Sequence, residues 1–129
     1  MRWELVKLVV AGFLGASVLI GGQAYGRQDP PNGVQATITR AELPRQGVET
    51  YDLVFKGGPF PYDKDGSVFG NRERILPLFK RGYYREYTVK TPSARNRGAR
   101  RIVCGGAATQ PEACYYTADH YASFRKIVP

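Results

Sequence analysis

The stretch Gly82-Tyr83-Tyr84-Arg85-Glu86-Tyr87-Thr88-Val89 (GYYREYTV) is rich in aromatic and β-branched residues, which favour a β-strand. Successive side chains of a strand point to opposite faces of its sheet. Tyr84, Glu86 and Thr88 therefore share one face of the predicted strand, and the residues between them share the other. Glu86 can accordingly lie on a sheet surface that faces a groove.

Three similar short runs follow, each bounded by Gly, Pro or Asp, as expected for strands linked by hairpins: residues 101–104, 114–117 and 122–128. Earlier in the chain, apolar residues recur at roughly helical spacing over 43–55, with Pro44 suited to a first turn. Gly57-Gly58-Pro59 ends this helix, and the turn formers of residues 59–66 predict a loop. The pattern predicts an α+β fold, in which one N-terminal helix packs on a single antiparallel β-sheet.

The length of 129 residues suits a single domain with one core. Residues 1–26 have the features of a secretory signal peptide, because Arg2 and Lys7 precede an apolar run of about 13 residues. A membrane-spanning helix needs ~20 apolar residues. Ala24-Tyr25-Gly26 places small residues where a signal peptidase reads, so we expect cleavage before Arg27. An uncleaved membrane anchor is the alternative.

The mature chain would begin with a flexible segment, residues 27–36, followed by a folded domain over 37–129. The whole chain has a formal net charge of +8 at pH 7. Without Arg2, Lys7 and Glu4, 17 of its 19 basic and 10 of its 11 acidic residues remain, which leaves +7. A small exported domain this basic favours polyanionic partners such as RNA, DNA or anionic lipid, although solubility alone also explains the charge.

Cys104 and Cys114 are the only cysteines, and an exported context permits them to pair across a short loop. Two buried free thiols are the other interpretation. Two cysteines and one histidine fall short of a four-ligand zinc site, so the sequence predicts no metal and no cofactor.

Glu86, Arg97, Arg101 and His120 supply a carboxylate, two guanidiniums and the only imidazole of the chain. Arg97 lies in the turn-rich segment 91–98 and Arg101 opens the next predicted strand, so both can fold toward the face of Glu86. Cleavage of a phosphodiester by a neighbouring hydroxyl needs a base, an acid and fixed positive charge around phosphorus. The four side chains meet these needs, although the same residue types also occur as ordinary surface groups.

Blocks of residues that match one family cover nearly the whole chain from about residue 37 to residue 127: Gly58-Pro59-Phe60-Pro61-Tyr62, Val68-Phe69-Gly70-Asn71-Arg72-Glu73, Gly82 through Val89, Thr91-Pro92-Ser93-Ala94-Arg95-Asn96-Arg97-Gly98, Arg100-Arg101-Ile102-Val103-Cys104-Gly105 and Asp119-His120-Tyr121. With these blocks the chain resembles the secreted guanyl-specific microbial ribonucleases of the barnase-like group, in particular the ribonuclease Sa branch. The resemblance implies the microbial ribonuclease fold and a metal-independent endoribonuclease that cuts single-stranded RNA 3′ to guanosine.

The resemblance also implies a role for each catalytic candidate. Glu86 falls on the general base that activates the 2′-hydroxyl, which attacks phosphorus and gives a 2′,3′-cyclic phosphate. His120 falls on the general acid that protonates the 5′-oxygen, and the two exchange roles when water opens the cyclic phosphate to a 3′-phosphate. Arg97 and Arg101 fall on the arginines that clamp the phosphate, and Arg72 is a candidate for the same environment.

Guanine selection is implied for the segment from Phe69 to Glu73. The Glu73 carboxylate can accept from N1–H and from the exocyclic amine, and backbone amides near Asn71 and Arg72 can donate to O6. Phe69 and Tyr121 can stack on the unpaired base. Asn71 is expected to shape the loop, and Gly70 stands where related members have a larger polar residue, so the loop is expected to be more flexible here.

A second departure concerns the disulfide. Related members tie their first strand to the C-terminus, whereas Thr39 occupies the first of those positions and no cysteine lies at the C-terminal end. A Cys104–Cys114 pair would be a different crosslink. The longer stretch 105–112 also leaves the placement of Tyr115 and Tyr116 open.

Three hypotheses follow. The first is a secreted, extracellular endoribonuclease, which predicts a bell-shaped pH dependence and activity in the presence of chelator. The second is a secreted noncatalytic RNA-binding module, which predicts salt-sensitive binding without product. The third is a membrane-tethered or structural envelope protein that keeps residues 1–26. For the first, we expect a monomer with no membrane contact after signal cleavage, and the family suggests a small acidic inhibitor protein as a partner.

We predict that the protein collected from culture medium begins at Arg27, because the apolar run is too short to hold the chain in a bilayer. N-terminal sequencing and intact mass measure this directly. Recovery of the chain in the membrane fraction with Met1 retained would contradict the signal-peptide assignment.

Overall fold

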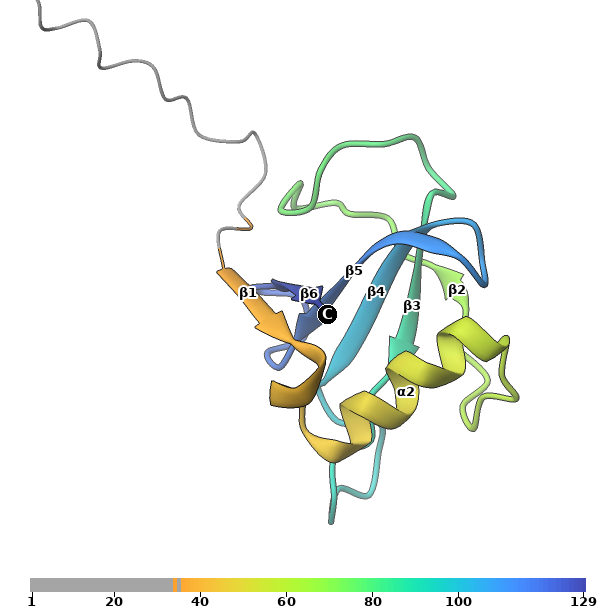
Figure 1. Cartoon of the computed structure of the whole chain (residues 1–129), viewed down its shortest axis with the longest axis vertical. Helices are drawn as coiled ribbons and strands as arrows, with labels where there is room; N and C mark the ends of the chain where they lie inside the picture. The colour runs from red at the N-terminus through yellow and green to blue at the C-terminus, as the bar shows by residue number, and fades with distance from the viewer. Residues whose placement is uncertain (1–33, 35) are drawn as a thin grey trace, which may run out of the picture. The chain divides into compact units, whose positions relative to one another are not determined.

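The structure is a computed structural model that describes residue 34 and residues 36–129. The predicted signal peptide and most of the predicted flexible segment 27–36 lie outside the described residues. The elements follow in chain order (Figure 1): β1 (Ala36–Thr39), the 3₁₀ helix η2 (Arg40–Glu42), α2 (Arg45–Lys56), β2 (Ser67–Val68), β3 (Tyr84–Thr88), β4 (Arg101–Gly106), β5 (Pro111–Thr117) and β6 (Arg125–Val128). Within this described part, no helix is long and apolar enough to cross a bilayer.

The strands form a six-stranded sheet in the order β1-β6-β5-β4-β3-β2. The ladders from β2 to β6 are antiparallel, whereas β1 pairs with β6 in parallel. The α+β class with a single sheet is thus confirmed, and its antiparallel character holds except at one edge. The β1–β6 pairing and the two-residue strand β2 were not predicted, and β1 begins at Ala36, one residue before the expected domain start.

Helix α2 begins two residues after the predicted start at 43 and ends one residue after the predicted end at 55, so Pro44 is its N-cap and not part of its first turn. Pro44 precedes the first turn, and Gly57 ends the helix in the left-handed conformation at φ 86°. Its N–H donates to the carbonyls of Leu53 and Val54, which would otherwise lack partners at the helix end. Thr50 is buried and its hydroxyl donates to the carbonyl of Thr88 at 2.9 Å. The helix is therefore fixed against β3 at the end of that strand.

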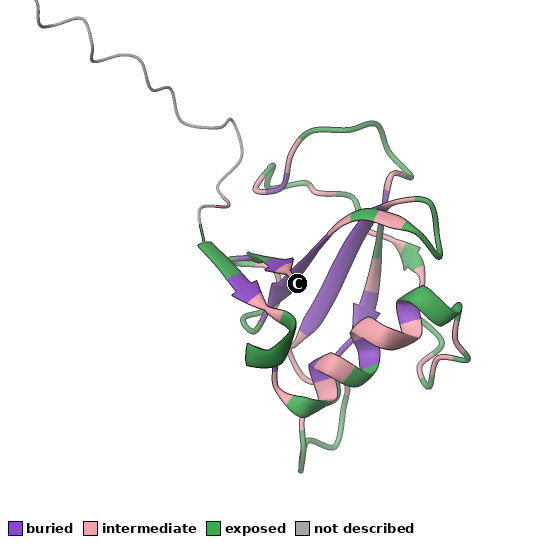
Figure 2. Cartoon of the chain, viewed as in Figure 1, coloured by how far each residue is buried: buried purple, intermediate pink, exposed green. Residues whose placement is uncertain are grey.

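The sheet has a packed face on each side. On the α2 side, ten buried residues form one cluster: Ile38, Leu43, Val54, Tyr87, Val89, Ile102, Cys104, Cys114, Tyr116 and Ile127. On the opposite side, Leu76, Tyr84, Val103, Tyr115 and Phe124 form a second cluster under the loop that follows β2 and the turn before β6. Figure 2 shows β4 buried along most of its length between these two layers.

The hairpin between β4 and β5 carries the confirmed Cys104–Cys114 disulfide, in which the two residues are direct cross-strand partners. Both strands are longer than predicted, so residues 105, 106, 111 and 112 belong to the strands and only 107–110 form the loop. Tyr115 pairs with Val103 and Tyr116 pairs with Ile102. The two tyrosines are both buried, on opposite faces of the sheet.

We predict that replacing both cysteines, Cys104→Ala with Cys114→Ala, lowers the free energy of unfolding by about 3 kcal/mol, because the crosslink restricts the unfolded chain. Urea unfolding at neutral pH, compared with the unreduced parent, measures the difference. A loss below about 1 kcal/mol would show that the hairpin is already held by its strand pairing.

Candidate active site

A cavity of about 660 Å³ opens on the sheet face opposite α2. Three parts of the chain line it. These are the segment that follows β2, strand β3, which contributes Glu86, and the turn before β6, which contributes His120 and Tyr121. Residues as far apart in the chain as Phe69 and Tyr121 are therefore brought to one concave surface. Most of the predicted site residues line this cavity, namely Phe69, Gly70, Asn71, Arg72, Glu73, Glu86, His120 and Tyr121.

Glu86 lies between the two predicted arginines. Its Oε1 accepts from Nη2 of Arg97 at 2.8 Å and lies 3.7 Å from Nε of Arg101. Arg97 also donates to the hydroxyl of Thr88, from Nε at 3.0 Å and from Nη2 at 2.8 Å. Glu86 and Thr88 share one face of β3, as the alternation predicted, and together they turn Arg97 inward from its loop.

Arg101 is almost completely buried, with 3% of its surface exposed. Its Nη1 donates to the carbonyls of Gly98 and Arg100, at 3.0 and 2.8 Å. Its Nε is buried and has no hydrogen-bond partner within the described chain. A buried guanidinium of this kind needs an opposite charge nearby, and Glu86 supplies it across the β3–β4 ladder.

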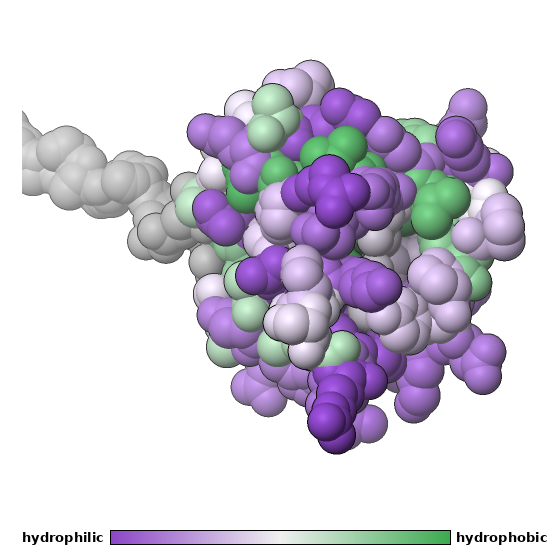
Figure 3. All heavy atoms as spheres, turned by 90° about the horizontal axis from the view of Figure 1, so that it is seen from below, coloured by the Kyte–Doolittle hydropathy of each residue, from purple (hydrophilic) through white to green (hydrophobic). Residues whose placement is uncertain are grey.

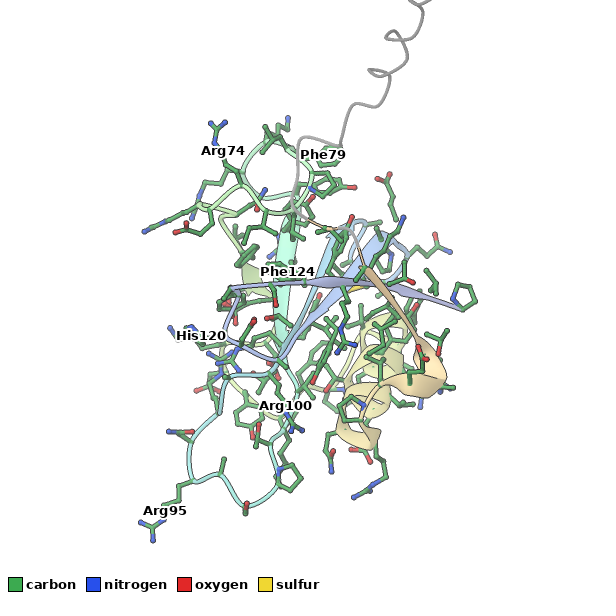
Figure 4. All side chains as sticks on the ribbon, turned by 90° about the vertical axis from the view of Figure 1, so that its left-hand side faces the viewer. Arg74, Phe79, Arg95, Arg100, His120 and Phe124 are labelled. Carbon is green, nitrogen blue, oxygen red and sulfur yellow. A yellow bond between two sulfur atoms is a disulfide. The ribbon has the colours of Figure 1, made fainter. Side chains whose placement is uncertain are left out.

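His120 lies in a tight turn and is exposed, as Figure 4 shows. His120 and Tyr121 both have left-handed backbone conformations, at φ 57° and 75°, which non-glycine residues rarely adopt. The His120 N–H donates to the carbonyl of Ala99 at 3.0 Å. This bond ties the turn to the segment between Arg97 and Arg101.

A hydrogen-bond network that sequence reasoning missed holds this turn. The buried Thr117 hydroxyl donates to Oδ1 of Asp119 at 2.8 Å and accepts from the N–H groups of Asp119 and Tyr121. The Asp119 carboxylate also accepts from the N–H and hydroxyl of Ser123. The Ser123 hydrogen bond is the main reason that the pKa of Asp119 is lowered. The order Thr-x-Asp-x-x-x-Ser, in which short polar side chains can bond nearby backbone, was the available signal.

Tyr121 lies over the arginine and carboxylate cluster. Burial raises the pKa of its hydroxyl to about 12, with a further rise from Glu86, so the group stays protonated at neutral pH. The Arg101 guanidinium lies 6.0 Å from the Tyr121 ring centroid. The rings of Tyr121 and Phe69 are 4.9 Å apart at 32°, so they pack on each other rather than flank an open slot. A planar base can therefore stack on one of these rings, or on both only after they separate.

The loop after β2 is shaped by Asn71, whose side chain donates to the carbonyl of Leu76 at 3.0 Å and accepts its N–H at 3.1 Å. Asn71 has φ 52°, a conformation that asparagine tolerates better than most residues. Arg72 and Glu73 are exposed at the rim. Arg81 fills the space beside Gly70. If residue 70 had a side chain, its Cβ would lie 3.3 Å from Nη1 of Arg81.

The arginines of residues 91–101 divide into two groups. Arg97 and Arg101 turn toward Glu86, whereas Arg95 projects from the far end of the loop (Figure 4). Hydrophilic side chains predominate on the face seen from below, toward which this loop extends (Figure 3). No cluster of three metal-ligating side chains occurs in the part of the chain that the structure describes.

The ribonuclease family model matches residues 27–128 of the chain. Guanyl-specific ribonuclease St of Saccharopolyspora erythraea is 56% identical over 91 residues, which are 70% of this chain and 86% of that protein. Guanyl-specific ribonuclease Sa of Kitasatospora aureofaciens is 52% identical over 94 residues, 73% of this chain and 95% of that protein.

A solved structure is also similar. The crystal structure of ribonuclease Sa2 with guanosine-2′-cyclophosphate superposes with a TM-score of 0.66 at 47% sequence identity, over 73% of this chain and 96% of that one.

We predict that Thr117→Val lowers the free energy of unfolding by about 1–3 kcal/mol, because two backbone N–H groups and the Asp119 carboxylate lose a buried partner. Amide chemical shifts of His120 and Tyr121 should move in the same variant. Thr109→Val, on the exposed β4–β5 loop, is the matched control. Unchanged His120 and Tyr121 shifts in Thr117→Val would show that the network does not position the turn.

The lowered pKa of Asp119 gives this network a pH dependence. The ionised carboxylate contributes its stability above the ordinary Asp pKa of about 3.9, and that contribution is lost as pH falls through the lower folded value. The difference in stability between the parent and Asp119→Asn should therefore shrink below about pH 4. A difference that persists at lower pH would point to packing rather than charge.

Proposed function

The chain belongs to the ribonuclease family, and we propose that it is an endoribonuclease that cleaves single-stranded RNA 3′ to guanosine. The observation that carries the proposal is the placement of Glu86 against Arg97 and Arg101, in one cavity with His120 and with residues 69–73. Two comparisons support both the reaction and the choice of guanine. The relatives are named guanyl-specific ribonucleases, and the Sa2 structure contains guanosine-2′-cyclophosphate.

The first step would use Glu86 as the general base. A deprotonated Glu86 takes the proton of the guanosine 2′-hydroxyl, whose oxygen then attacks the adjacent phosphorus. The non-bridging oxygens gain negative charge as phosphorus becomes pentacoordinate, and the Arg97 and Arg101 guanidiniums lie beside the base to offset that charge.

His120 would act as the general acid. Protonated His120 gives its proton to the departing 5′-oxygen of the next nucleotide, and the product is a 2′,3′-cyclic phosphate. In the second step the neutral imidazole activates a water molecule, which opens the ring, while Glu86 returns its proton to the 2′-oxygen. The product is a 3′-phosphate. Exposure of His120 at the cavity edge suits a group that must meet the leaving nucleotide and then water.

Base selection would rest on the loop after β2. Glu73 at the rim can accept two hydrogen bonds from the N1–H and amine of guanine, a pair of donors that adenine lacks. The Asn71 side chain is occupied by Leu76, so it holds the backbone amides of the loop in place for O6 and does not itself contact the base. Phe69 or Tyr121 would supply the stacking surface.

We further propose that residues 1–26 direct secretion and are removed, and that the mature enzyme acts outside the cell as a monomer. The net charge of +7 after removal suits a polyanionic substrate, and it would equally suit a small acidic protein inhibitor in the producing cell. Co-purification of a tagged chain from its producing cells tests the inhibitor.

The deciding experiment incubates the purified protein with a synthetic RNA that holds a single G, in the presence of chelator. We expect one cut, on the 3′ side of that G. Cuts after every base alike would reject guanine selection. Salt-sensitive binding with the RNA left intact would instead support the noncatalytic RNA-binding module.

We predict that Glu86→Gln and His120→Ala each slow the cut by roughly 10² or more, the usual worth of a general base or acid. Glu73→Ala should mainly lower the preference for G over A, by roughly 10- to 100-fold, because it removes hydrogen bonds to a charged acceptor. Initial rates on matched G and A substrates separate these effects. Glu49→Gln, on the exposed face of α2, is the control, and a normal rate in His120→Ala would refute the acid assignment.

A further inference from the structure

Phe79 and Tyr83 form an exposed aromatic platform beside the cavity. Their ring centroids are 3.8 Å apart and the ring planes are 13° from parallel. Tyr83 is held from below, because its ring lies against Gly105 and its hydroxyl donates to Oε1 of Glu112 at 2.5 Å. Phe79 nevertheless has 55% of its surface exposed, more than the 45% of Phe55 on α2. The Phe79 ring, stacked on the anchored Tyr83, therefore presents an open surface to solvent.

The loop that carries the platform is strongly basic. Residues 72–81 hold four exposed basic side chains, Arg72, Arg74, Lys80 and Arg81, against the single acid Glu73. Lys80 and Arg81 directly follow Phe79, and Figure 4 shows Phe79 and Arg74 on the same end of the molecule. An exposed aromatic ring beside cations is the combination that single-stranded nucleic acids bind, the base by stacking and the phosphate by charge.

The platform is continuous with the cavity. Arg81 packs against Gly70, which lines the cavity, and Phe79 is two residues from Arg81. The Tyr84 hydroxyl donates to the carbonyl of Pro77 at 2.6 Å, so the loop is tied to β3 just before Phe79. Gly70, which has no side chain, leaves the room that Arg81 occupies.

We propose, on the basis of the proposed function, that Arg81, Lys80 and the Phe79–Tyr83 platform form a subsite for the RNA nucleotides on the 5′ side of the guanosine. In Figure 4, His120 lies between the Phe79 end of the molecule and the Arg95 end. His120 would protonate the nucleotide on the 3′ side, which leaves past the catalytic groups toward the arginine loop. The preceding nucleotides then extend toward Phe79, where one base stacks while Lys80 and Arg81 bind its phosphates.

The test compares three RNA substrates that share one scissile G–U bond: the dinucleotide GpU, the 5′-extended AAAGU and the 3′-extended GUAAA. The wild-type protein should cut AAAGU with a higher kcat/KM than GpU. Phe79→Leu keeps an apolar contact on Tyr83 but removes the ring, and it should lower kcat/KM on AAAGU by about 5- to 100-fold, the range that base stacking spans. Its rates on GpU and GUAAA should stay within about twofold of the parent.

The contribution of Lys80 and Arg81 is measured separately, from the salt dependence of cleavage. Lys80→Gln with Arg81→Gln should make the dependence of log kcat/KM on log salt shallower for AAAGU, by about 0.7 for each phosphate that these side chains neutralise in the parent. The slope for GpU should not change. Phe55→Leu and Lys56→Gln are matched controls, because Phe55 is an exposed aromatic residue followed by a lysine at the end of α2, away from the cavity.

Equal losses of activity on GpU and AAAGU in Phe79→Leu would overturn the subsite, because the ring would then act through the fold or the base loop. A loss of activity confined to GUAAA in Phe79→Leu would also overturn the subsite. Unchanged cleavage together with a changed molecular mass in analytical ultracentrifugation would overturn it in favour of self-association through Phe79. If the wild-type protein cuts none of the three RNAs, the proposed function fails as well. Cleavage of GpU with no effect of Phe79→Leu rejects the subsite alone.

Discussion

The burial of the Arg101 guanidinium is the constraint on which the rest of the site depends. A cation with 3% of its surface exposed is costly unless a negative charge and hydrogen bonds compensate it. The carbonyls of Gly98 and Arg100 supply hydrogen bonds, and Glu86, itself 15% exposed at its side chain, supplies the charge. The cross-strand register of β3 and β4 places Glu86 within reach, so the sheet itself determines the distance between the Glu86 carboxylate and the Arg101 guanidinium.

This cluster explains why the surrounding loops are built as they are. The Thr88 hydroxyl holds the Arg97 guanidinium beside Glu86, and the His120 turn is tied to the same segment through Ala99. Two residues with left-handed backbone, His120 and Tyr121, persist there because the Thr117 network holds them. The charges that face the cavity are thus arranged before a substrate arrives, which is the condition for electrostatic stabilisation of a transition state.

Much of this arrangement follows from the sequence, for identifiable reasons. The alternation of side chains in residues 84–89 predicted that Glu86 and Thr88 share one face of the sheet. The helical spacing of apolar residues, followed by Gly57, predicted α2. The parallel β1–β6 pairing was not predictable, because two four-residue strands far apart in the chain carry no local signal for their partner. The placement of Tyr115 and Tyr116 was left open because the lengths of β4 and β5 were underestimated. The packing of Phe69 on Tyr121 depends on tertiary contacts that no sequence spacing encodes.

In the proposed mechanism the RNA is cut through its own 2′-hydroxyl by groups of the protein. The most direct measurement replaces the single guanosine of a substrate with 2′-deoxyguanosine and identifies the ends by mass spectrometry. The ribose substrate should first yield a 2′,3′-cyclic phosphate and a 5′-hydroxyl, and the deoxy substrate should stay intact. Cleavage of the deoxy substrate, or ends that carry a 5′-phosphate, would contradict this mechanism.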